Sequence, residues 1–352
     1  MTIKTTTPSS NGIKVLLIYT GGTIGMLENP ITKGLEVCDF AYVAEHVQEI
    51  SQLPFGIDTL TFEPPCDSSD AGTDLWVQIA EMVTKYYDAY DGFVVLHGTD
   101  TMAYTASGLS FMFENLGKPI ILTGSQVPIG KLRTDGKENL LTALEVAASK
   151  DSEGRAAVNE VCILFNNNLI RGNRATKVSA DQFNAFQSPN YHNLAEIGIE
   201  IDFNQHSMLP HPTGPLTTHT KLDTNVLLLK LFPGLSPEVI DACFNAPGLR
   251  GIVLETFGSG NAPSNERFMK VVREGVARDI VIVNVTQCPQ GKVQMKRYET
   301  GRTLLSAGVL SGYDMTAEAA VAKLMYLLGL LEDSEQVKHY MGVNLRGEFS
   351  PF

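Results

Sequence analysis

The sequence predicts an α/β fold in which a mostly parallel sheet carries helices on both faces. Short runs of Val, Ile and Leu, bounded by Gly, Pro, Asn or Asp, alternate along the chain with segments of helical spacing. The runs are apolar on both faces, which is typical of parallel strands buried between helices. The predicted strands are 15–20, 92–97, 119–123, 161–165, 226–231, 251–254 and 280–285.

The segments between these strands place apolar residues three and four positions apart, which is the spacing of one helix face. The clearest cases are predicted as helices at 43–50, 75–86, 102–113, 140–146 and 321–328. Strand and helix therefore alternate in both halves of the chain.

The domain organisation follows from a break in this alternation between Asp202 and Asp223. Residues 208–216 hold three prolines and one glycine without an apolar period, and a chain of 352 residues suits about two domains. We predict a larger N-terminal domain over 13–205, a linker over 206–223 and a smaller C-terminal parallel βαβ domain over 224–352. The polar residues 1–14 are expected to form a frayed tail, with the first strand starting near Ile13.

Composition excludes several classes of partner. The net charge is −12 at pH 7 and the chain has no basic run, which argues against nucleic acid. No apolar run approaches the roughly 20 residues of a membrane helix, and the N-terminus lacks the features of a secretory signal. The five cysteines include no Cys-x-x-Cys pair, so neither a disulfide framework nor a zinc site is indicated. We expect a cytoplasmic protein.

Two turns rich in threonine and glycine follow predicted strands. Thr20-Gly-Gly-Thr-Ile-Gly25 follows the run that begins at Val15, and His97-Gly-Thr-Asp-Thr101 follows the run 92–96. Ligands of open α/β sheets bind outside the carboxyl ends of the strands, so these turns are expected to meet at one pocket. A threonine hydroxyl can act as a nucleophile there if a base takes its proton and nearby donors stabilise the oxyanion.

Each turn also has a purely structural interpretation. Gly21 and Gly22 could form a tight turn with Thr23 as a helix cap, and Thr99 or Asp100 could cap the following helix. In the functional interpretation, the glycines allow a substrate to approach the backbone closely beside Thr23. An ionised Asp100 could bind the ammonium group of a substrate or orient a neighbouring ammonium. From each turn alone the two interpretations are about equal.

Other kinds of catalytic or binding site have less support in the sequence. There is no His-Glu-x-x-His pattern and no Gly-x-Ser-x-Gly elbow, and the first glycine turn lacks the lysine of a phosphate loop. His97 could be catalytic, although a histidine at the end of a buried strand is more often a structural hydrogen-bonding group. The loop 258–263 could receive a carboxylate or phosphate at a helix start, with loop packing as the alternative.

Taken together, five motifs resemble those of the bacterial-type L-asparaginases, and most closely their cytoplasmic type I branch. The resemblance covers nearly the whole chain after the first dozen residues and extends to 257–263, 286–288 and 344–348. It implies a two-domain asparaginase-like fold and the hydrolysis of asparagine to aspartate and ammonia through a threonine acyl-enzyme, without metal or organic cofactor. The motifs are Tyr19-Thr-Gly-Gly-Thr-Ile-Gly-Met26, Asp67-Ser-Ser-Asp70, His97-Gly-Thr-Asp-Thr-Met-Ala-Tyr-Thr-Ala106, Leu122-Thr-Gly-Ser-Gln126 and Arg171-Gly-Asn-Arg-Ala-Thr-Lys177.

The resemblance also implies roles for individual residues. Thr23 matches the primary nucleophile, and Thr99 and Lys177 match the second threonine and its lysine. Asp100 matches the residue that holds the α-amino group of the substrate. The three residues Asp67, Ser68 and Ser69 match the loop that receives the α-carboxylate. Without the resemblance, Lys177 would be taken for a surface lysine, because lysine is seldom buried.

One departure from the family pattern concerns the base that activates Thr23. Many relatives carry a Tyr in the loop after the first turn, but residues 27–40 contain none and Leu35 lies near the expected place. Tyr19 and Tyr42 are the available substitutes, Tyr19 being better suited to packing in the strand. Residues 28–34, with Pro30 and Gly34 as pivots, are expected to act as a lid.

The resemblance further implies a homo-oligomer, a dimer or a tetramer. Two other functions stay open: an ammonia-delivering amidotransferase subunit of the same superfamily, and a non-catalytic module that binds amino acids. The first would require a partner, and the second would bind asparagine without releasing ammonia.

Overall fold

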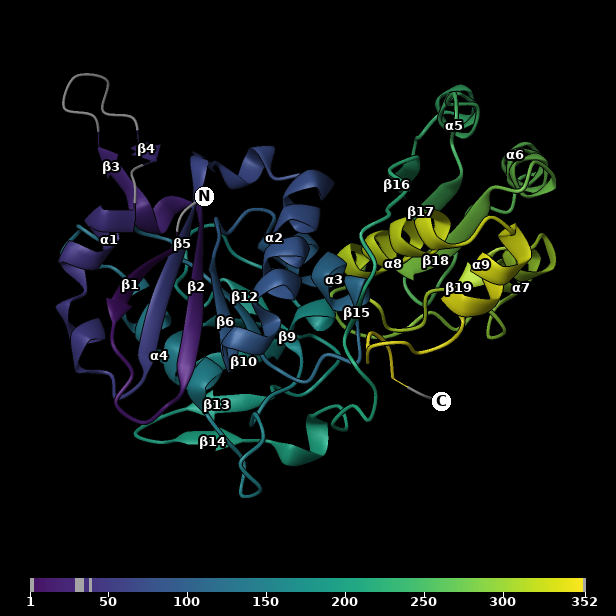
Figure 1. Ribbon diagram of the computed structural model, residues 1–352. Helices are drawn as coiled ribbons and strands as arrows, with labels where there is room; N and C mark the ends of the chain where they lie inside the picture. Colours follow the sequence, from purple (N-terminus) through teal and green to yellow (C-terminus); the bar gives the residue numbers. More distant parts are fainter. Residues whose placement is uncertain (1–2, 29–34, 38–39, 351–352) are drawn as a thin grey trace. The chain divides into compact units, whose positions relative to one another are not determined.

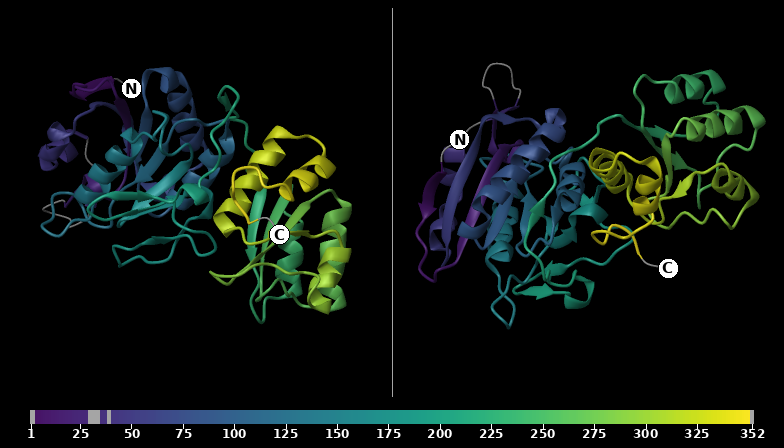
Figure 2. Two further views of the ribbon diagram at one scale, coloured as in Figure 1. Left: turned by 90° about the horizontal axis from the view of Figure 1, so that it is seen from below. Right: turned by 45° about the vertical axis from the view of Figure 1, so that its right-hand side comes forward.

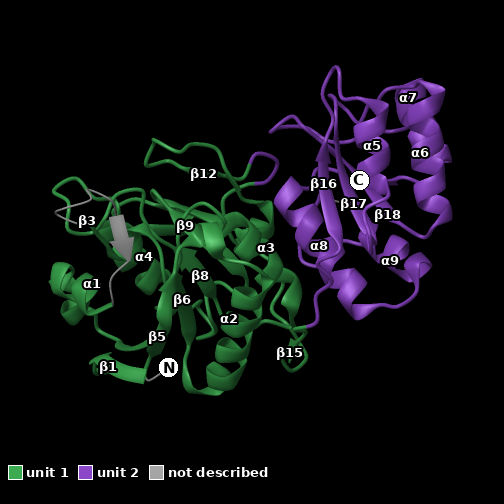
Figure 3. Ribbon diagram, turned by 90° about the horizontal axis from the view of Figure 1, so that it is seen from above, with its two compact units in different colours: residues 1–188, 192–220 green, residues 189–191, 221–352 purple. Residues whose placement is uncertain are grey.

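The computed structural model describes residues 3–28, 35–37 and 40–350 (Figure 1). The chain divides into two compact units, coloured separately in Figure 3. Unit 1 comprises Met1–Ser188 and His192–Thr220, and unit 2 comprises Pro189–Tyr191 and Lys221–Phe352.

Unit 1 is organised around a mixed sheet that, within the described residues, has nine strands. Five central strands are parallel, and antiparallel strands flank them at both edges. The mostly parallel sheet predicted from the sequence is confirmed. In spatial order the strands are β1 (Ile3–Thr7), β5 (Gly56–Cys66), β2 (Lys14–Gly21), β6 (Gly92–Leu96), β8 (Ile120–Thr123), β9 (Val161–Phe165), β10 (Asn168–Arg171), β13 (Ala195–Ile197) and β14 (Ile201–Phe203).

Helices cover both faces of this sheet, as its apolar strands require. Figure 3 shows α4 on one side of the central strands and α2 and α3 on the other. Every residue of β6, β8 and β9 is buried, because both faces pack against helices. The helices of unit 1 are α1 (Phe40–His46), α2 (Thr73–Tyr86), α3 (Met102–Met112) and α4 (Gly136–Ala148).

Smaller elements connect these layers. The described residues form three two-stranded pairs: β3 (Met26–Glu28) with β4 (Leu35–Val37), β7 (Phe113–Glu114) with β15 (Thr217–Thr218), and β11 (Thr176–Lys177) with β12 (Phe186–Gln187). Short 3-10 turns lie at Thr23–Gly25, Gln48–Gln52, Ser68–Asp70, Tyr87–Ala89, Gly172–Arg174 and Gln205–Ser207. Residues 29–34 lie outside the described part of the chain, and with them both expected lid pivots, Pro30 and Gly34.

The expectation of a frayed N-terminal tail was wrong. Residues Ile3–Thr7 form β1, which pairs antiparallel with β5 at the edge of the sheet. The Thr6 hydroxyl lies 2.8 Å from that of Thr59, and Thr7 is buried. The polar sequence of this segment suits an edge strand with one solvated face.

The segment expected to be a linker, 206–223, is largely bound to unit 1. The amide of Leu209 donates to Glu160, β15 pairs with β7, and the amide of His219 donates to the carbonyl of Met112. The chain passes to unit 2 after Thr220. Prolines at 210, 212 and 215 interrupt helical spacing, and the segment crosses the surface of unit 1 as extended chain.

Unit 2 contains a four-stranded parallel sheet among its described residues. Residues along a strand pack on different helices: Ile252 and Leu254 belong to a core with Phe244 and Phe268, and Gly251 lies against Leu324 of α8. Figure 2 shows helices on both sides of these strands. The strands are β16 (Val226–Lys230), β17 (Gly251–Thr256), β18 (Val281–Thr286) and β19 (Leu310–Ser311), and the helices are α5 (Pro237–Phe244), α6 (Glu266–Ala277), α7 (Glu299–Ser306), α8 (Ala317–Leu330) and α9 (Ser334–Met341).

A buried ion pair ties the last residues of the chain to unit 2. Lys323 of α8 and Glu348 are both fully buried and lie 2.5 Å apart. The Lys323 ammonium also donates to the carbonyls of Met341 and Val343. Burial lowers the pKa of Lys323, and the nearby carboxylate of Glu348 opposes this shift.

Among the described residues of the two units, none of the helices has the length and apolar character needed to span a membrane.

Candidate active site

Four neighbouring strands of unit 1 end at the same edge of the sheet. In the parallel register Tyr19 of β2 pairs with Leu96 of β6, and Leu96 pairs with Thr123 of β8. On the other side of β2, Gly21 pairs with Cys66 at the end of β5. The residues that follow these positions form the turns singled out in the sequence, at the edge where open α/β sheets bind ligands.

Two glycines let these turns touch. Gly22 has φ 91° and ψ 173°, a conformation that only glycine adopts readily, and a Cβ at this position would lie 2.4 Å from the amide nitrogen of Gly98. A Cβ on Gly98 would lie 2.4 Å from the Ser68 hydroxyl oxygen. Thr23 and Thr99 each follow one of these glycines, so the two threonine turns lie against each other, and the second turn also lies against Ser68.

The second turn carries a cluster of three functional side chains. The Lys177 ammonium donates to the Thr99 hydroxyl at 2.8 Å and to the Asp100 carboxylate at 2.7 Å. Thr99 is buried, the Lys177 side chain is 19% exposed and the Asp100 side chain is 66% exposed. One ammonium thus joins a buried hydroxyl to a carboxylate that faces solvent.

Lys177 reaches this position from a short β-hairpin. It lies in β11 opposite Phe186 of β12, and Phe186 is buried against Phe165 with ring centroids 5.1 Å apart. The amide of Val178 donates to the carbonyl of Ala185 and continues the pairing. The aromatic contact anchors the hairpin in the core, so Lys177 is not the free surface lysine that its local sequence suggests.

Gln126 belongs to the same cluster, although no separate role was predicted for it. The Thr99 hydroxyl donates to Gln126 Oε1 at 3.2 Å. The Gln126 side-chain nitrogen donates to the carbonyls of Ser179 and Gln182, at 3.4 and 3.2 Å. These bonds fix which end of the amide faces Thr99. The only sequence signal was the place of Gln126 in a motif after a predicted strand.

The Asp67–Ser69 loop has a well-defined internal structure. Asp67 Oδ1 accepts hydrogen bonds from both the amide and the hydroxyl of Ser69, each at 2.9 Å. The Ser68 carbonyl accepts from the hydroxyl of Thr101 at 2.7 Å. Asp67 therefore stabilises the turn Ser68–Asp70, and the buried Ser68 faces the Gly98 turn.

His97 lies in the core beside this cluster. It is 1% exposed, with Nδ1 2.7 Å from the carbonyl of Gly98 and Nε2 3.0 Å from the hydroxyl of Thr105. Burial lowers the pKa of His97, and the hydrogen bond to the Gly98 carbonyl opposes this shift. A neutral ring that donates from Nδ1 and accepts at Nε2 satisfies both contacts, which is a structural role.

The two tyrosines considered as bases for Thr23 differ in their surroundings. Tyr19 is fully buried, with its ring 5.9 Å from that of Phe40. Tyr42 packs on His46 with ring centroids 4.3 Å apart. Among residues 3–28, 35–37 and 40–350 the Thr23 hydroxyl has no hydrogen-bond partner, so these residues do not identify its base.

Two histidines of the segment 206–223 lie beside acidic residues. His211 lies 3.5 Å from Asp151, and His219 lies 3.2 Å from Glu114. The described residues contain no cluster of three or more His, Cys, Asp or Glu side chains that could hold a metal ion.

In unit 2, the loop 258–263 packs on the buried Asn284. The Asn284 side chain donates to the carbonyl of Gly260 at 3.1 Å and accepts from the Thr256 hydroxyl at 2.7 Å. These contacts agree with the packing alternative for this loop.

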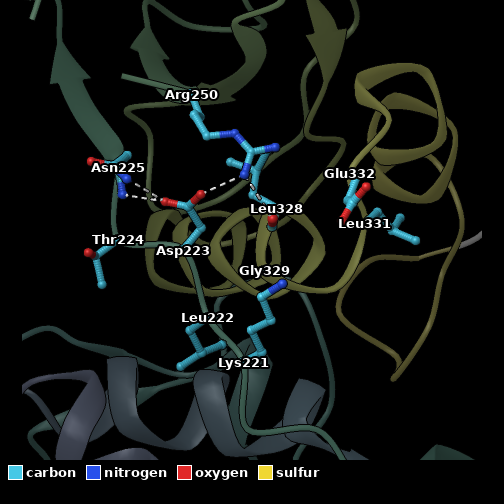
Figure 4. Close-up of a pocket in the computed structure, with 10 residues that line it drawn as sticks. All are labelled: Lys221, Leu222, Asp223, Thr224, Asn225, Arg250, Leu328, Gly329, Leu331 and Glu332. Atoms are coloured by element: carbon cyan, nitrogen blue, oxygen red, sulfur yellow. Dashed lines mark hydrogen bonds and ion pairs between the residues drawn. The ribbon is translucent and has the colours of Figure 1, made fainter. Parts of the chain in front are cut away.

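Unit 2 also has a polar groove of ≈ 470 Å³, shown in Figure 4. Arg250 crosses it and donates to Asp223 at 2.7 Å and to the carbonyl of Leu328 at 3.2 Å, with Lys221 and Glu332 on its walls. The groove lies at the amino ends of β16 and β17. None of the site residues predicted from the sequence lines it.

Comparisons with known proteins agree with this architecture. Residues 14–209 match the family model "Asparaginase, N-terminal", and residues 225–341 match "Glutaminase/Asparaginase C-terminal domain". The chain is 46% identical to L-asparaginase 1 of Escherichia coli K12, over 96% of this chain and 98% of that protein.

Solved structures give the same result. L-asparaginase I of Vibrio cholerae superposes with a TM-score of 0.86 at 42% identity, covering 96% of this chain and 99% of that one. The L-asparaginase of Thermococcus kodakarensis superposes with a TM-score of 0.88 at 36% identity, covering 97% and 100%.

Fold and site together define a two-domain α/β protein with a threonine–lysine–aspartate cluster at the carboxyl edge of its larger sheet. The matches cover both units and nearly the full length of the relatives. The chain belongs to the asparaginase family.

Proposed function

We propose that this protein hydrolyses L-asparagine to L-aspartate and ammonia through an acyl-enzyme on threonine. The observation that carries the proposal is the Lys177 ammonium, 2.8 Å from the hydroxyl of Thr99 and 2.7 Å from the carboxylate of Asp100. A hydroxyl bonded to a cation can pass a proton on, and a solvent-facing carboxylate can bind an amino group. The named relatives, all L-asparaginases, support the same reaction.

In the first step the Thr23 hydroxyl oxygen attacks the side-chain amide carbon of the substrate. A C–O bond forms as the Thr23 hydroxyl loses its proton to a base, the C–N bond breaks, and the nitrogen leaves as ammonia after it gains a proton; the base then passes its proton to the solvent, where ammonia becomes ammonium. Water then hydrolyses the ester, releasing aspartate and returning a proton to the Thr23 oxygen. Covalent catalysis of this kind divides one difficult step into two easier ones.

The proton reaches the leaving nitrogen through Thr99. The Lys177 ammonium donates to the Thr99 oxygen, and the Thr99 hydroxyl can turn from Gln126 towards the substrate to pass its own proton on. General acid catalysis by a positioned group contributes typically 10²–10⁴-fold in rate. Lys177 regains its proton when water attacks the ester.

Substrate binding uses the two ends of the amino acid. Asp100 binds the α-ammonium, and the loop Asp67, Ser68 and Ser69 binds the α-carboxylate through its hydroxyl and amide donors. Fixing both ends places the amide carbon against Thr23, which converts an encounter in solution into a reaction within one complex.

The same proposal includes the cofactor requirement, location, assembly and domain bounds of the protein. The enzyme works without metal or organic cofactor, resides in the cytoplasm and forms a homo-oligomer, a dimer or tetramer. The region over 13–205 carries the catalytic groups, and 224–352 forms the second domain. Similarity to cytoplasmic type I enzymes supports these statements, and light scattering after size exclusion measures the assembly.

Ammonia release from L-asparagine tests the proposal against its alternatives. The wild-type chain should release ammonia without a partner, whereas Thr23→Ala and Thr99→Val should each lose nearly all activity and keep the fold. Lys177→Met should lose about 10²-fold or more in kcat if the lysine acts as a general acid. Asparagine binding without ammonia release would favour a binding module, and ammonia release only with a tRNA-linked partner would favour the amidotransferase.

A further inference from the structure

Thr101 occupies the N-cap position of α3 but does not cap the helix. An N-cap threonine ordinarily accepts a hydrogen bond from the second or third amide of its helix. Thr101 makes no such side-chain bond, and its hydroxyl donates 2.7 Å to the carbonyl of Ser68, 33 residues earlier. The hydroxyl is therefore committed to the Ser68 turn and contributes nothing to the start of the helix.

This bond completes the hydrogen bonding of the Ser68 carbonyl. The amide of Ala71 donates to the same oxygen at 3.2 Å, so both lone pairs of the carbonyl are used. Gly98 provides a second point of contact, because its Cα faces the Ser68 side chain too closely for any Cβ to fit. The Ser68 turn is thus held by residues 98 and 101, on either side of Asp100.

We propose that Thr101 is a positioning residue that sets the spacing between the carboxylate-binding turn at Ser68 and the ammonium-binding group of Asp100. The inference rests on the proposed function, in which these two sites bind opposite groups of one substrate. The α-carboxylate and α-ammonium are bonded to the same carbon, so both sites are satisfied only at one separation. The Thr101 hydroxyl fixes that separation by tying the turn to the N-cap position of α3.

The substrate's α-carboxylate and α-ammonium bind at different sites, so ligands with and without the α-carboxylate can test the role of Thr101 separately from its effect on fold stability. Thr101→Val keeps the shape of the side chain and removes the donor, and Thr101→Ser keeps the donor. Because the Thr101 side chain makes no capping bond, the valine variant loses only the bond to Ser68, and its free energy of unfolding should fall by about 0.5–1.5 kcal/mol, which leaves the fold intact. Thr84→Val is the matched control: the Thr84 hydroxyl donates to the carbonyl of Ala80, away from the site.

The experiment measures kcat and KM for L-asparagine, together with competitive inhibition by L-aspartate and by β-alanine, which lacks the α-carboxylate. Thr101→Val should raise KM and the inhibition constant of L-aspartate about tenfold, as expected for one hydrogen bond, with kcat changed less than threefold. Inhibition by β-alanine should stay unchanged. Thr101→Ser should restore the wild-type KM, and Thr84→Val should retain it.

Three outcomes would overturn the inference while the wild-type enzyme remains active. These are an unchanged KM in Thr101→Val, a loss confined to kcat, or equal weakening of L-aspartate and β-alanine. A wild-type chain that releases no ammonia from L-asparagine would instead overturn the proposed function, and with it the assigned roles of Ser68 and Asp100.

Discussion

Replacing Gly22 by alanine should separate the two threonine turns. The new Cβ would lie 2.4 Å from the amide nitrogen of Gly98, 2.6 Å from its Cα and 2.8 Å from the carbonyl carbon of His97. All three atoms belong to the backbone and cannot rotate away. Ordinary carbon contacts lie at roughly 3.5–4.0 Å, so the turns must move apart by on the order of 1 Å.

The structure gives the size of the effect. Alanine at the backbone angles of Gly22 costs about 1–3 kcal/mol in strain, and overpacking adds about 1–3 kcal/mol. Gly22→Ala should therefore lower the free energy of unfolding by about 2–6 kcal/mol. A shift of about 1 Å between the groups that bind and attack the substrate should lower kcat/KM roughly 10²-fold.

Gly234→Ala is the matched control for this prediction. Gly234 has φ 93°, close to the 91° of Gly22, but no atom lies within 4 Å of the position of its added Cβ. It should show the backbone strain alone and keep its activity. Denaturant unfolding and ammonia release measure both variants. The reasoning fails if Gly22→Ala unfolds like Gly234→Ala and retains kcat/KM within twofold of wild type.

Two further predictions concern buried charge. Burial lowers the pKa of His97, so in acid the unfolded chain binds a proton at His97 that the folded chain does not bind. Stability should fall as the pH drops below about 6.5, by up to about 1.4 kcal/mol per pH unit, and His97→Gln should flatten that slope in unfolding measured at pH 7 and pH 5. If the free energy of unfolding of His97→Gln changes with pH as steeply as that of the wild type, the pH dependence comes from other groups and the prediction is wrong. Glu348→Gln leaves the buried ammonium of Lys323 without its carboxylate and should cost about 3–5 kcal/mol. The surface control Glu335→Gln should cost about 0–1 kcal/mol, and equal unfolding midpoints for the two variants would contradict this account.

The central strands could be predicted from the sequence because burial on both faces leaves an unbroken apolar run. The runs near Val15, Val161 and Val281 all correspond to parallel strands. The edge strand β1 and its neighbour β5 gave no such signal. The segment 3–7 is rich in threonine, and 56–66 mixes Asp, Thr and Pro with apolar residues. Both are strands because of their neighbours, and a pairing partner cannot be identified from local composition.

The site was predictable in its residue types and less so in its geometry. Thr99 and Asp100 could be singled out because they follow a buried strand directly. Lys177 came only from the family resemblance, since its position depends on a hairpin anchored by Phe186. Gln126 was given no role because its contacts are with residues more than twenty positions away. Contacts between distant turns depend on strand register, which the motifs do not encode.

The most direct test of the proposed mechanism is to quench the enzyme during turnover of L-asparagine and to map its peptides by mass. The proposal predicts an aspartyl ester on Thr23 in the peptide that contains this residue, and its absence in Thr23→Ala. An adduct at Thr99 or at any other residue, with none at Thr23, would contradict the assignment of the nucleophile.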